Sequence, residues 1–214
     1  MEPLTVLGVF VGQPRVIGVG GDGRPVTSAI GKERVTEPSV AVGPRTIAGD
    51  AQADPTVHGG PDKVVYAYPA PHYAHWRAAG FALDVGGLGE NVAVVGAAEH
   101  DVRIGDVWRW GDALLQVSQP RSPCYKLALH VGRRGAGREM VRTGRSGWYL
   151  RVLSPGIAPT AGVIERIGSD PTEPTVAEAF AAVVGPGPGR DDLVAARVRG
   201  SAHLAAQWRA ALAR

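Results

Sequence analysis

The chain has one cysteine in 214 residues, at position 124. A single thiol cannot form an internal disulfide, so the sequence excludes a disulfide scaffold. One cysteine is also too few for a cysteine-rich zinc site or for the ligand set of an iron–sulfur cluster. Whatever chemistry this thiol performs, it performs without a second cysteine from the same chain.

Long apolar runs are also missing. No stretch approaches the roughly 20 apolar residues that a helix needs to cross a bilayer. The start, MEPLTVLGVFVG, lacks a basic leader, and glycine interrupts its short apolar run. We therefore expect a soluble, cytoplasmic protein that does not contact a membrane.

Charge of one sign is not concentrated in the sequence. The formal net charge is +3 and the pI is about 9.3, but the basic residues are mixed with 20 acidic ones. Nucleic-acid-binding proteins usually gather their basic residues in a patch or stripe. We therefore expect no dedicated nucleic-acid binding.

Aromatic residues make up 6% of the chain, whereas glycine and proline are abundant, with 30 and 17 residues. This composition favours many short strands joined by tight turns. Strands are expected at 4–12, 15–19, 64–69, 92–96, on both sides of Gly111–Asp112, at 148–153 and at 164–168. Residues 15–19 are expected to pair with 4–12, and residues 71–80 to form a short helix. The fold class is therefore mainly β.

The composition changes after residue 169. Thr175 and Glu178 have the spacing of a helix capping box, and apolar residues then recur at helical intervals. Two further helices are expected, one ending at Gly200 and one capped by Ser201. The sequence thus predicts a β domain over 1–169 and a small three-helix bundle over 170–214. So short a bundle rarely has a stable core of its own, and we expect it to dock on the β domain or on a partner.

The segment QVSQPRSPCYKL at 116–127 carries the cysteine. Ser122 and Pro123 predict the start of a helix that ends at Gly132, with Cys124 in its first turn. A helix N-terminus and the nearby Arg121 and Lys126 favour a thiolate. One soft ligand does not hold a metal by itself, so a cofactor would have to bring the other ligands. A buried structural cysteine remains an alternative.

Several stretches of the chain resemble one known family. They are GDAQAD at 49–54, HGGPDK at 58–63 with the following VVYAYPAPHYAHW, GEN at 89–91, IGDVWRWGDALLQVSQPRSPCYKL at 104–127 and GRSGWYLRVL at 144–153. Together with the helical tail they resemble the MOSC domains, which are related to the C-terminal domain of molybdenum-cofactor sulfurase. The chain is most similar to a bacterial subgroup with a three-helix C-terminal extension. Leu88 and Tyr125 depart from the aromatic residue and the tryptophan that are common at these positions.

The resemblance implies a partly closed β-barrel with a few short helices, and a molybdenum cofactor (molybdopterin). It implies that Cys124 is the protein ligand to molybdenum. It also places a set of further residues around the site, namely His58, Lys63, Glu90, Asn91 and Arg121. Lys63, Arg121, Arg145 and Arg151 are candidate partners of the pterin phosphate, and Gly59 and Gly60 would let the backbone approach a ligand closely.

The same resemblance implies a molybdenum-dependent oxidoreductase that reduces N-hydroxylated small molecules such as hydroxylaminopurine, with electrons from a separate donor protein. His58 is the candidate proton donor, because an imidazole titrates near neutral pH. Two alternatives stay open. One is a non-catalytic carrier of the cofactor or of sulfur. The other is a hydrolase or transferase with Cys124 as nucleophile and His58 as base.

Overall fold

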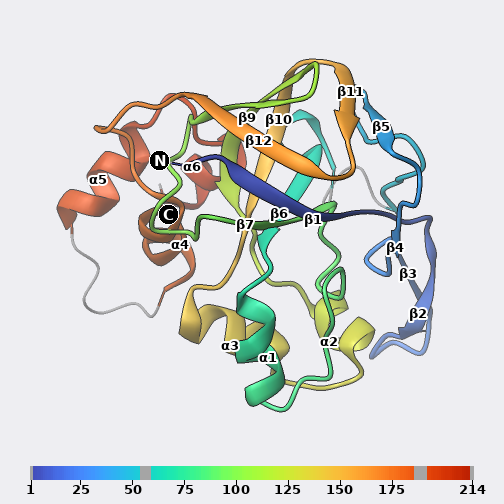
Figure 1. Cartoon of the computed structure of the whole chain (residues 1–214). Coiled ribbons are helices and arrows are strands. Elements are labelled where there is room, and N and C mark those ends of the chain that lie inside the picture. Colours follow the sequence, from blue (N-terminus) through green and yellow to red (C-terminus); the bar gives the residue numbers. More distant parts are fainter. Residues whose placement is uncertain (1, 54–58, 186–191, 213–214) are drawn as a thin grey trace.

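The computed structural model describes residues 2–53, 59–185 and 192–212, and a closed ring of seven strands forms its centre (Figure 1). In order around the ring, the strands are β12 (Gly162–Gly168), β8 (Val107–Trp110), β9 (Ala113–Pro120), β10 (Trp148–Ser154), β6 (Val65–Pro69), β7 (Val92–Val95) and β1 (Leu4–Val11). The strand β1 also pairs with β12, so that Leu4 faces Ile164. The predicted mainly β barrel is confirmed, and its ring is complete rather than partly closed.

Shorter strands lie outside the ring. β2 (Arg15–Val19) pairs with β3 (Pro25–Ser28), β4 (Glu33–Arg34) pairs with the end of β1, and β5 (Ser39–Val42) pairs with β11 (Gly156–Pro159). The expected pairing of 15–19 with 4–12 is therefore wrong. The chain leaves β1 at Gly12, whose N–H donates to Asp50 Oδ1 at 2.8 Å, and the N–H of Gly20 then bonds to the carbonyl of Arg24 at 2.8 Å. These two bonds direct β2 into a hairpin of its own.

The hairpin between β8 and β9 follows the expected turn chemistry. Gly111 has a φ of 59°, whereas no residue other than glycine has a positive φ in the described chain. This combination agrees with a type II′ turn, in which glycine takes the first of the two loop positions. A side chain at Gly111 would also lie 2.3 Å from the carbonyl oxygen of Ile157, so that glycine is required here for space as well as for conformation.

Three helices gather at one end of the barrel (Figure 1): α1 (His72–Ala78), α2 (Tyr125–Val131) and α3 (Ala136–Thr143). The first two were expected from the sequence. The helix α3 was not, because its glycine and arginines carry little apolar pattern and it buries only Ala136 and Met140. A 3-10 turn, η1 (Pro61–Lys63), leads into β6.

The C-terminal part contains α4 (Val176–Val184), α5 (Asp192–Gly200) and α6 (Ala206–Leu212). The capping box of α4 is present, with Thr175 and Glu178 bonded to each other's backbone N–H at 2.8 and 3.1 Å. Ser201 does not cap the last helix, which begins at Ala206. Residues 201–205 instead run along the barrel, where the N–H of Ala205 donates to the carbonyl of Ser118 at 2.9 Å.

The tail docks on the barrel, as expected. Val176, Ala179 and Phe180 are buried in the same apolar cluster as the barrel strands. Two backbone hydrogen bonds tie the start of α4 to the loop after β7, from Val176 to Val102 and from Ala177 to Glu99. The boundary between residues 169 and 170 stays a prediction. None of the described helices is long and apolar enough to span a membrane.

Candidate functional site

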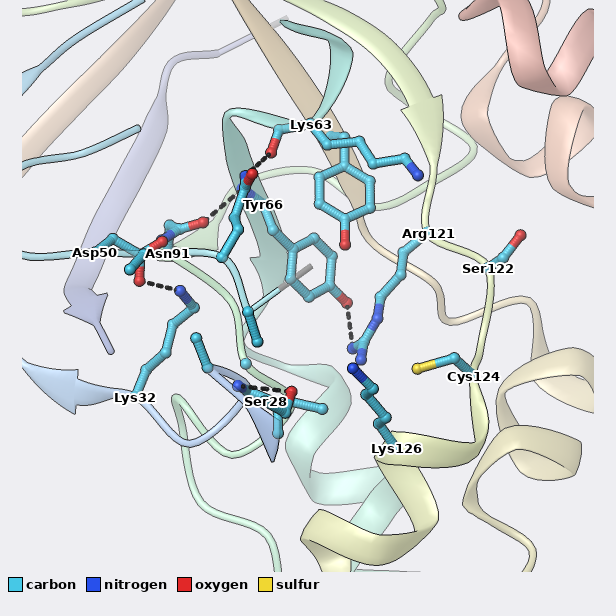
Figure 2. Close-up of a pocket in the computed structure, with 17 residues that line it drawn as sticks. Ser28, Lys32, Asp50, Lys63, Tyr66, Asn91, Arg121, Ser122, Cys124 and Lys126 are labelled. Carbon is cyan, nitrogen blue, oxygen red and sulfur yellow. Dashed lines mark hydrogen bonds and ion pairs between the residues drawn. The ribbon is translucent and has the colours of Figure 1, made fainter. Parts of the chain in front are cut away.

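A pocket opens beside the start of α2, and the sulfur of Cys124 points into it (Figure 2). Four cationic side chains and one carboxylate line this pocket: Lys32, Lys63, Arg121, Lys126 and Asp50. The remaining walls come mainly from Ser28–Ile30, Ala51–Ala53, Tyr66, Asn91 and Tyr149. The excess of positive charge makes the pocket suitable for an anionic ligand.

Cys124 lies directly before α2 rather than within its first turn. Its φ of −127° and ψ of 164° are extended, and the helix begins at Tyr125, not at Pro123. The carbonyl of Cys124 accepts from the N–H of Leu127 at 3.1 Å, which fixes the residue at the helix start. The thiol is free and only partly buried. Its place in the wall of a cationic pocket argues against a purely structural cysteine.

Arg121 forms the floor of the pocket. Its side chain is 6% exposed, and Nη1 donates to the carbonyl of Leu88 at 2.6 Å and to the hydroxyl of Tyr66 at 3.3 Å. Burial alone would lower the pKa of Arg121, but Tyr66, Tyr149 and Cys124 outweigh it and raise this pKa. Arg121 therefore keeps a fixed positive charge beside the thiol.

Two tyrosines stand next to this arginine. Their rings are 5.1 Å apart, and the hydroxyl of Tyr66 donates to the carbonyl of Ser146 at 2.8 Å. Burial raises the pKa of both Tyr66 and Tyr149. Both hydroxyls therefore stay protonated at neutral pH, and that of Tyr66 is committed to the Ser146 carbonyl.

A hydrogen-bonded group on the opposite wall fixes Asn91 and Lys32. Asn91 Nδ2 donates to Asp50 Oδ2 at 2.8 Å, and Asn91 Oδ1 accepts from the backbone of Tyr66 at 3.0 Å. Asp50 also forms a buried ion pair with Lys32. Burial lowers the pKa of Lys32, although Asp50 opposes the shift. Asn91, expected from the resemblance, thus lies in the pocket.

Lys63 reaches the pocket from η1 and connects it to the tail. Its Nζ donates to Oε1 of Gln207 in α6 at 2.9 Å, and its carbonyl accepts from Nε2 of Gln52 at 3.2 Å. Partial burial lowers the pKa of Lys63, against the opposing effect of Asp62. The lysine is therefore positioned from two sides.

Glu90 lies behind the pocket wall and not in it. This buried carboxylate accepts from Tyr73 Oη at 2.6 Å and from the N–H groups of Gly86 and Leu88 at 2.8 and 3.2 Å. Burial raises the pKa of Glu90. Because the carbonyl of Leu88 binds Arg121, Glu90 supports the arginine through the loop and would not touch a ligand directly.

The two other predicted phosphate partners also lie elsewhere. Arg145 borders a separate hollow together with His72 and Glu99. Arg151 joins the barrel to the tail, since it binds Asp62 Oδ1 and the carbonyl of His203, each at 2.7 Å. Neither arginine lines the described pocket. Arg145 Nε is buried without a hydrogen-bond partner among the described residues, and the expected contact of both arginines with the pterin phosphate stays a prediction.

The glycine motif has a conformational role. Gly60 has a φ of 98° and precedes η1, where its carbonyl accepts from the N–H of Lys63 at 3.1 Å. Gly59 and Gly60 do not line the described pocket. His58 lies outside the described residues, so its role stays a prediction. In the described part of the chain, no three His, Cys, Asp or Glu residues are close enough to hold a metal ion.

Sequence reasoning missed Lys32, Tyr66 and Tyr149 as pocket residues, and it quoted Asp50 only as part of a motif. Tyr66 belongs to β6, where all five residues are buried, so no alternation marks which side chain faces the pocket. Lys32 lies in a short segment without a motif. Only the closeness of Lys32, Asp50 and Asn91 in space identifies this wall.

The closed β-barrel carries a partly exposed cysteine in a cationic pocket, and such a pocket is suited to an anionic ligand or cofactor. Comparison with known proteins gives the family: the model of the MOSC domain matches residues 54–165. The chain belongs to the MOSC domain family, as the sequence motifs indicated.

Similarity to two individual proteins extends over nearly the whole chain. It is 35% identical to the uncharacterized protein YflK of Bacillus subtilis over 210 residues, which are 98% of this chain and 93% of that protein. The crystal structure of YiiM from Geobacillus stearothermophilus has a TM-score of 0.80 and 30% identity, covering 99% of this chain and 98% of that one. A protein named reductase from Gibberella moniliformis is 37% identical over 160 residues, 72% of this chain but 28% of that longer protein.

Proposed function

We propose that this protein is a molybdenum-cofactor-dependent oxidoreductase that reduces N-hydroxylated compounds, such as hydroxylaminopurine-type bases, with electrons from a separate donor protein. The observation that carries the proposal is the position of Cys124, whose sulfur points into a pocket with four cationic side chains. The similarity to a segment of a longer chain named reductase supports a redox role.

The donor groups of the pocket fit such a cofactor. A pterin cofactor presents its metal through a dithiolene, to which a single thiolate adds a further soft ligand. Cys124 Sγ would supply that ligand. The phosphate of the pterin cofactor would be held by Lys63, Arg121 and Lys126 through charge-assisted hydrogen bonds. Asp50 repels a bound anion only weakly, because Lys32 neutralises its negative charge.

The reaction converts R–NHOH, two electrons and two protons into R–NH₂ and water. The N–O bond breaks and the nitrogen is reduced, while the donor protein is oxidised. When bound, the molybdenum centre supplies the two-electron redox chemistry. The chain itself must deliver a proton to the leaving oxygen. His58 is the predicted donor, because an imidazole titrates near neutral pH.

The proposal is tested on protein purified from cells that make the pterin. Molybdenum content and turnover of hydroxylaminopurine with reduced methyl viologen are measured for the wild type, for Cys124→Ser and for Ser39→Ala, an exposed change in β5. We expect Cys124→Ser to lose about 100-fold or more in turnover and most of its molybdenum, and Ser39→Ala to match the wild type. If the wild type contains molybdenum but shows no turnover, the protein is a carrier of the cofactor. If the wild type contains no molybdenum but its thiol is reactive, the hydrolase alternative is favoured.

A further inference from the structure

Contrary to the expectation of dispersed charge, basic residues are concentrated in α3 and in the segment between α2 and α3. Between Gly132 and Arg145 the sequence has five arginines and one glutamate, a local excess of four charges in a chain whose net charge is +3. Arg133, Arg134, Arg138 and Arg142 are exposed. The remaining sequence is therefore close to neutral, and the four exposed arginines make this segment a basic patch in which Glu139 is the one acidic residue.

Most of these charges are not neutralised. Glu139 accepts from Arg142 at 3.0 and 2.6 Å, so this pair uses the one carboxylate of the segment. Arg133 stacks on Phe81, with 4.7 Å from Cζ to the ring centroid, and donates to backbone carbonyls. Among the described residues, no carboxylate pairs with Arg134 or Arg138. Their charges remain available to an external partner.

An apolar hollow lies within this patch. Pro123, Tyr125, Ala128 and Val141 line it, and Arg138 and Arg142 border it. The side chain of Tyr125 is 63% exposed, although aromatic rings are usually covered. An apolar centre with an exposed tyrosine and an arginine rim is the composition of a protein–protein interface.

The hollow and the cationic pocket meet at one residue. Cys124 borders both, with its sulfur in the pocket and the flanking Pro123 and Tyr125 in the hollow. A protein bound over the hollow would therefore lie against the segment that carries the proposed metal ligand. Electron transfer requires such closeness between the two redox centres.

We propose that the α2–α3 face, defined as the exposed surface around Tyr125, Arg134 and Arg138, is the docking surface for an acidic electron-transfer protein. This inference rests on the proposed function, because it assigns the place where the electron donor binds. Acidic residues of the donor bind the arginines, and its apolar contact covers the hollow. Each reaction cycle then takes two electrons from the donor, which is oxidised as the N–O bond is cleaved.

The test compares two reductants on the loaded enzyme: reduced methyl viologen, which needs no docking, and reduced flavodoxin, a small acidic protein. The variant is Arg134→Glu with Arg138→Glu. The matched control is Arg45→Glu with Arg109→Glu, two exposed arginines away from this face. We expect the variant to lose about 10-fold or more of the flavodoxin-driven kcat/KM, with methyl viologen turnover within about twofold of the wild type. The control should keep both rates.

Salt provides a second readout. Raising the ionic strength from about 20 to about 300 mM shortens the range of charge interactions, so the flavodoxin-driven rate of the wild type should fall and that of the variant should change little. Equal losses in the variant and the control, or no salt dependence, would overturn the inference. The inference would also be overturned if Arg134 and Arg138 bind a DNA oligonucleotide while the flavodoxin-driven rate of the variant equals that of the wild type. Failure of the proposed function itself is distinct, because methyl viologen turnover would then be missing in the wild type.

Discussion

The guanidinium of Arg121 lies over the ring of Tyr66, with 4.9 Å between Cζ and the ring centroid. The same arginine donates to the Tyr66 hydroxyl and to the carbonyl of Leu88. This contact joins β6, the end of β9 and the loop before β7 under the pocket. It therefore combines a structural role with a charge that faces the ligand.

Removing this guanidinium should destabilise the protein. Arg121→Met leaves the buried carbonyl of Leu88 without its donor, and we expect the free energy of unfolding to fall by about 2–3 kcal/mol. Urea denaturation measures the change. Arg45→Met, at an exposed position, should stay within about 0.5 kcal/mol of the wild type. Equal stability of the two variants would show that Arg121 does not support the pocket floor.

The buried pair of Asp50 and Lys32 should respond unequally to substitution. Asp50 accepts from Gly12, Lys32 and Asn91. Asp50→Ala removes the shared acceptor of these three donors and leaves a buried ammonium without its counter-charge, so we expect a loss of about 3–5 kcal/mol. Lys32→Met leaves Asp50 with its two other donors and should cost less. Denaturation of both variants gives the order, and the reverse order would contradict this assignment.

Stability should depend on pH through Glu139. Hydrogen bonds from Arg142 and His75 lower its pKa from 4.5 to about 2. A folded-state pKa below the unfolded one means that the stabilisation is present above about pH 4.5 and is lost as the pH falls towards 2. The stability difference between the wild type and Glu139→Gln should therefore shrink from pH 5 to pH 2. A difference that stays constant over this range would refute the ionised pairing.

The barrel and the tail should unfold together. Phe180 of α4 is 2% exposed and belongs to the core cluster of the barrel. Phe180→Ala should lower the free energy of unfolding by about 3–5 kcal/mol. Tryptophan fluorescence and circular dichroism should both report one cooperative transition, shifted to the same extent. Two separate transitions, with only one shifted, would instead support independent domains over 1–169 and 170–214.

Local patterns predicted much of this fold. The capping box at Thr175, the turn at Gly111 and most strands were readable because each depends on a few neighbouring residues. The helix α3 was missed since it buries few side chains. Ser201 was misread as a cap because contacts with the barrel, and not helix signals, determine the course of residues 201–205.

The site was predictable only in part. The thiol was recognisable from its flanking residues, and the motif resemblance identified Asn91, Lys63 and Arg121, which all border the pocket. Arg151 could not be distinguished from a ligand-binding arginine, because its partners Asp62 and His203 are distant in sequence. Lys32 and Asp50 meet through a buried ion pair that no local pattern reveals.

The pairing of Leu4 in β1 with Ile164 in β12 has a consequence for biosynthesis. During synthesis, β1 cannot obtain this neighbour until the chain has been made as far as β12. Contacts so distant in sequence slow folding, and the waiting β1 exposes an unpaired edge that can attract other nascent chains. We therefore expect premature termination before residue 162 to yield aggregating fragments rather than a smaller working protein.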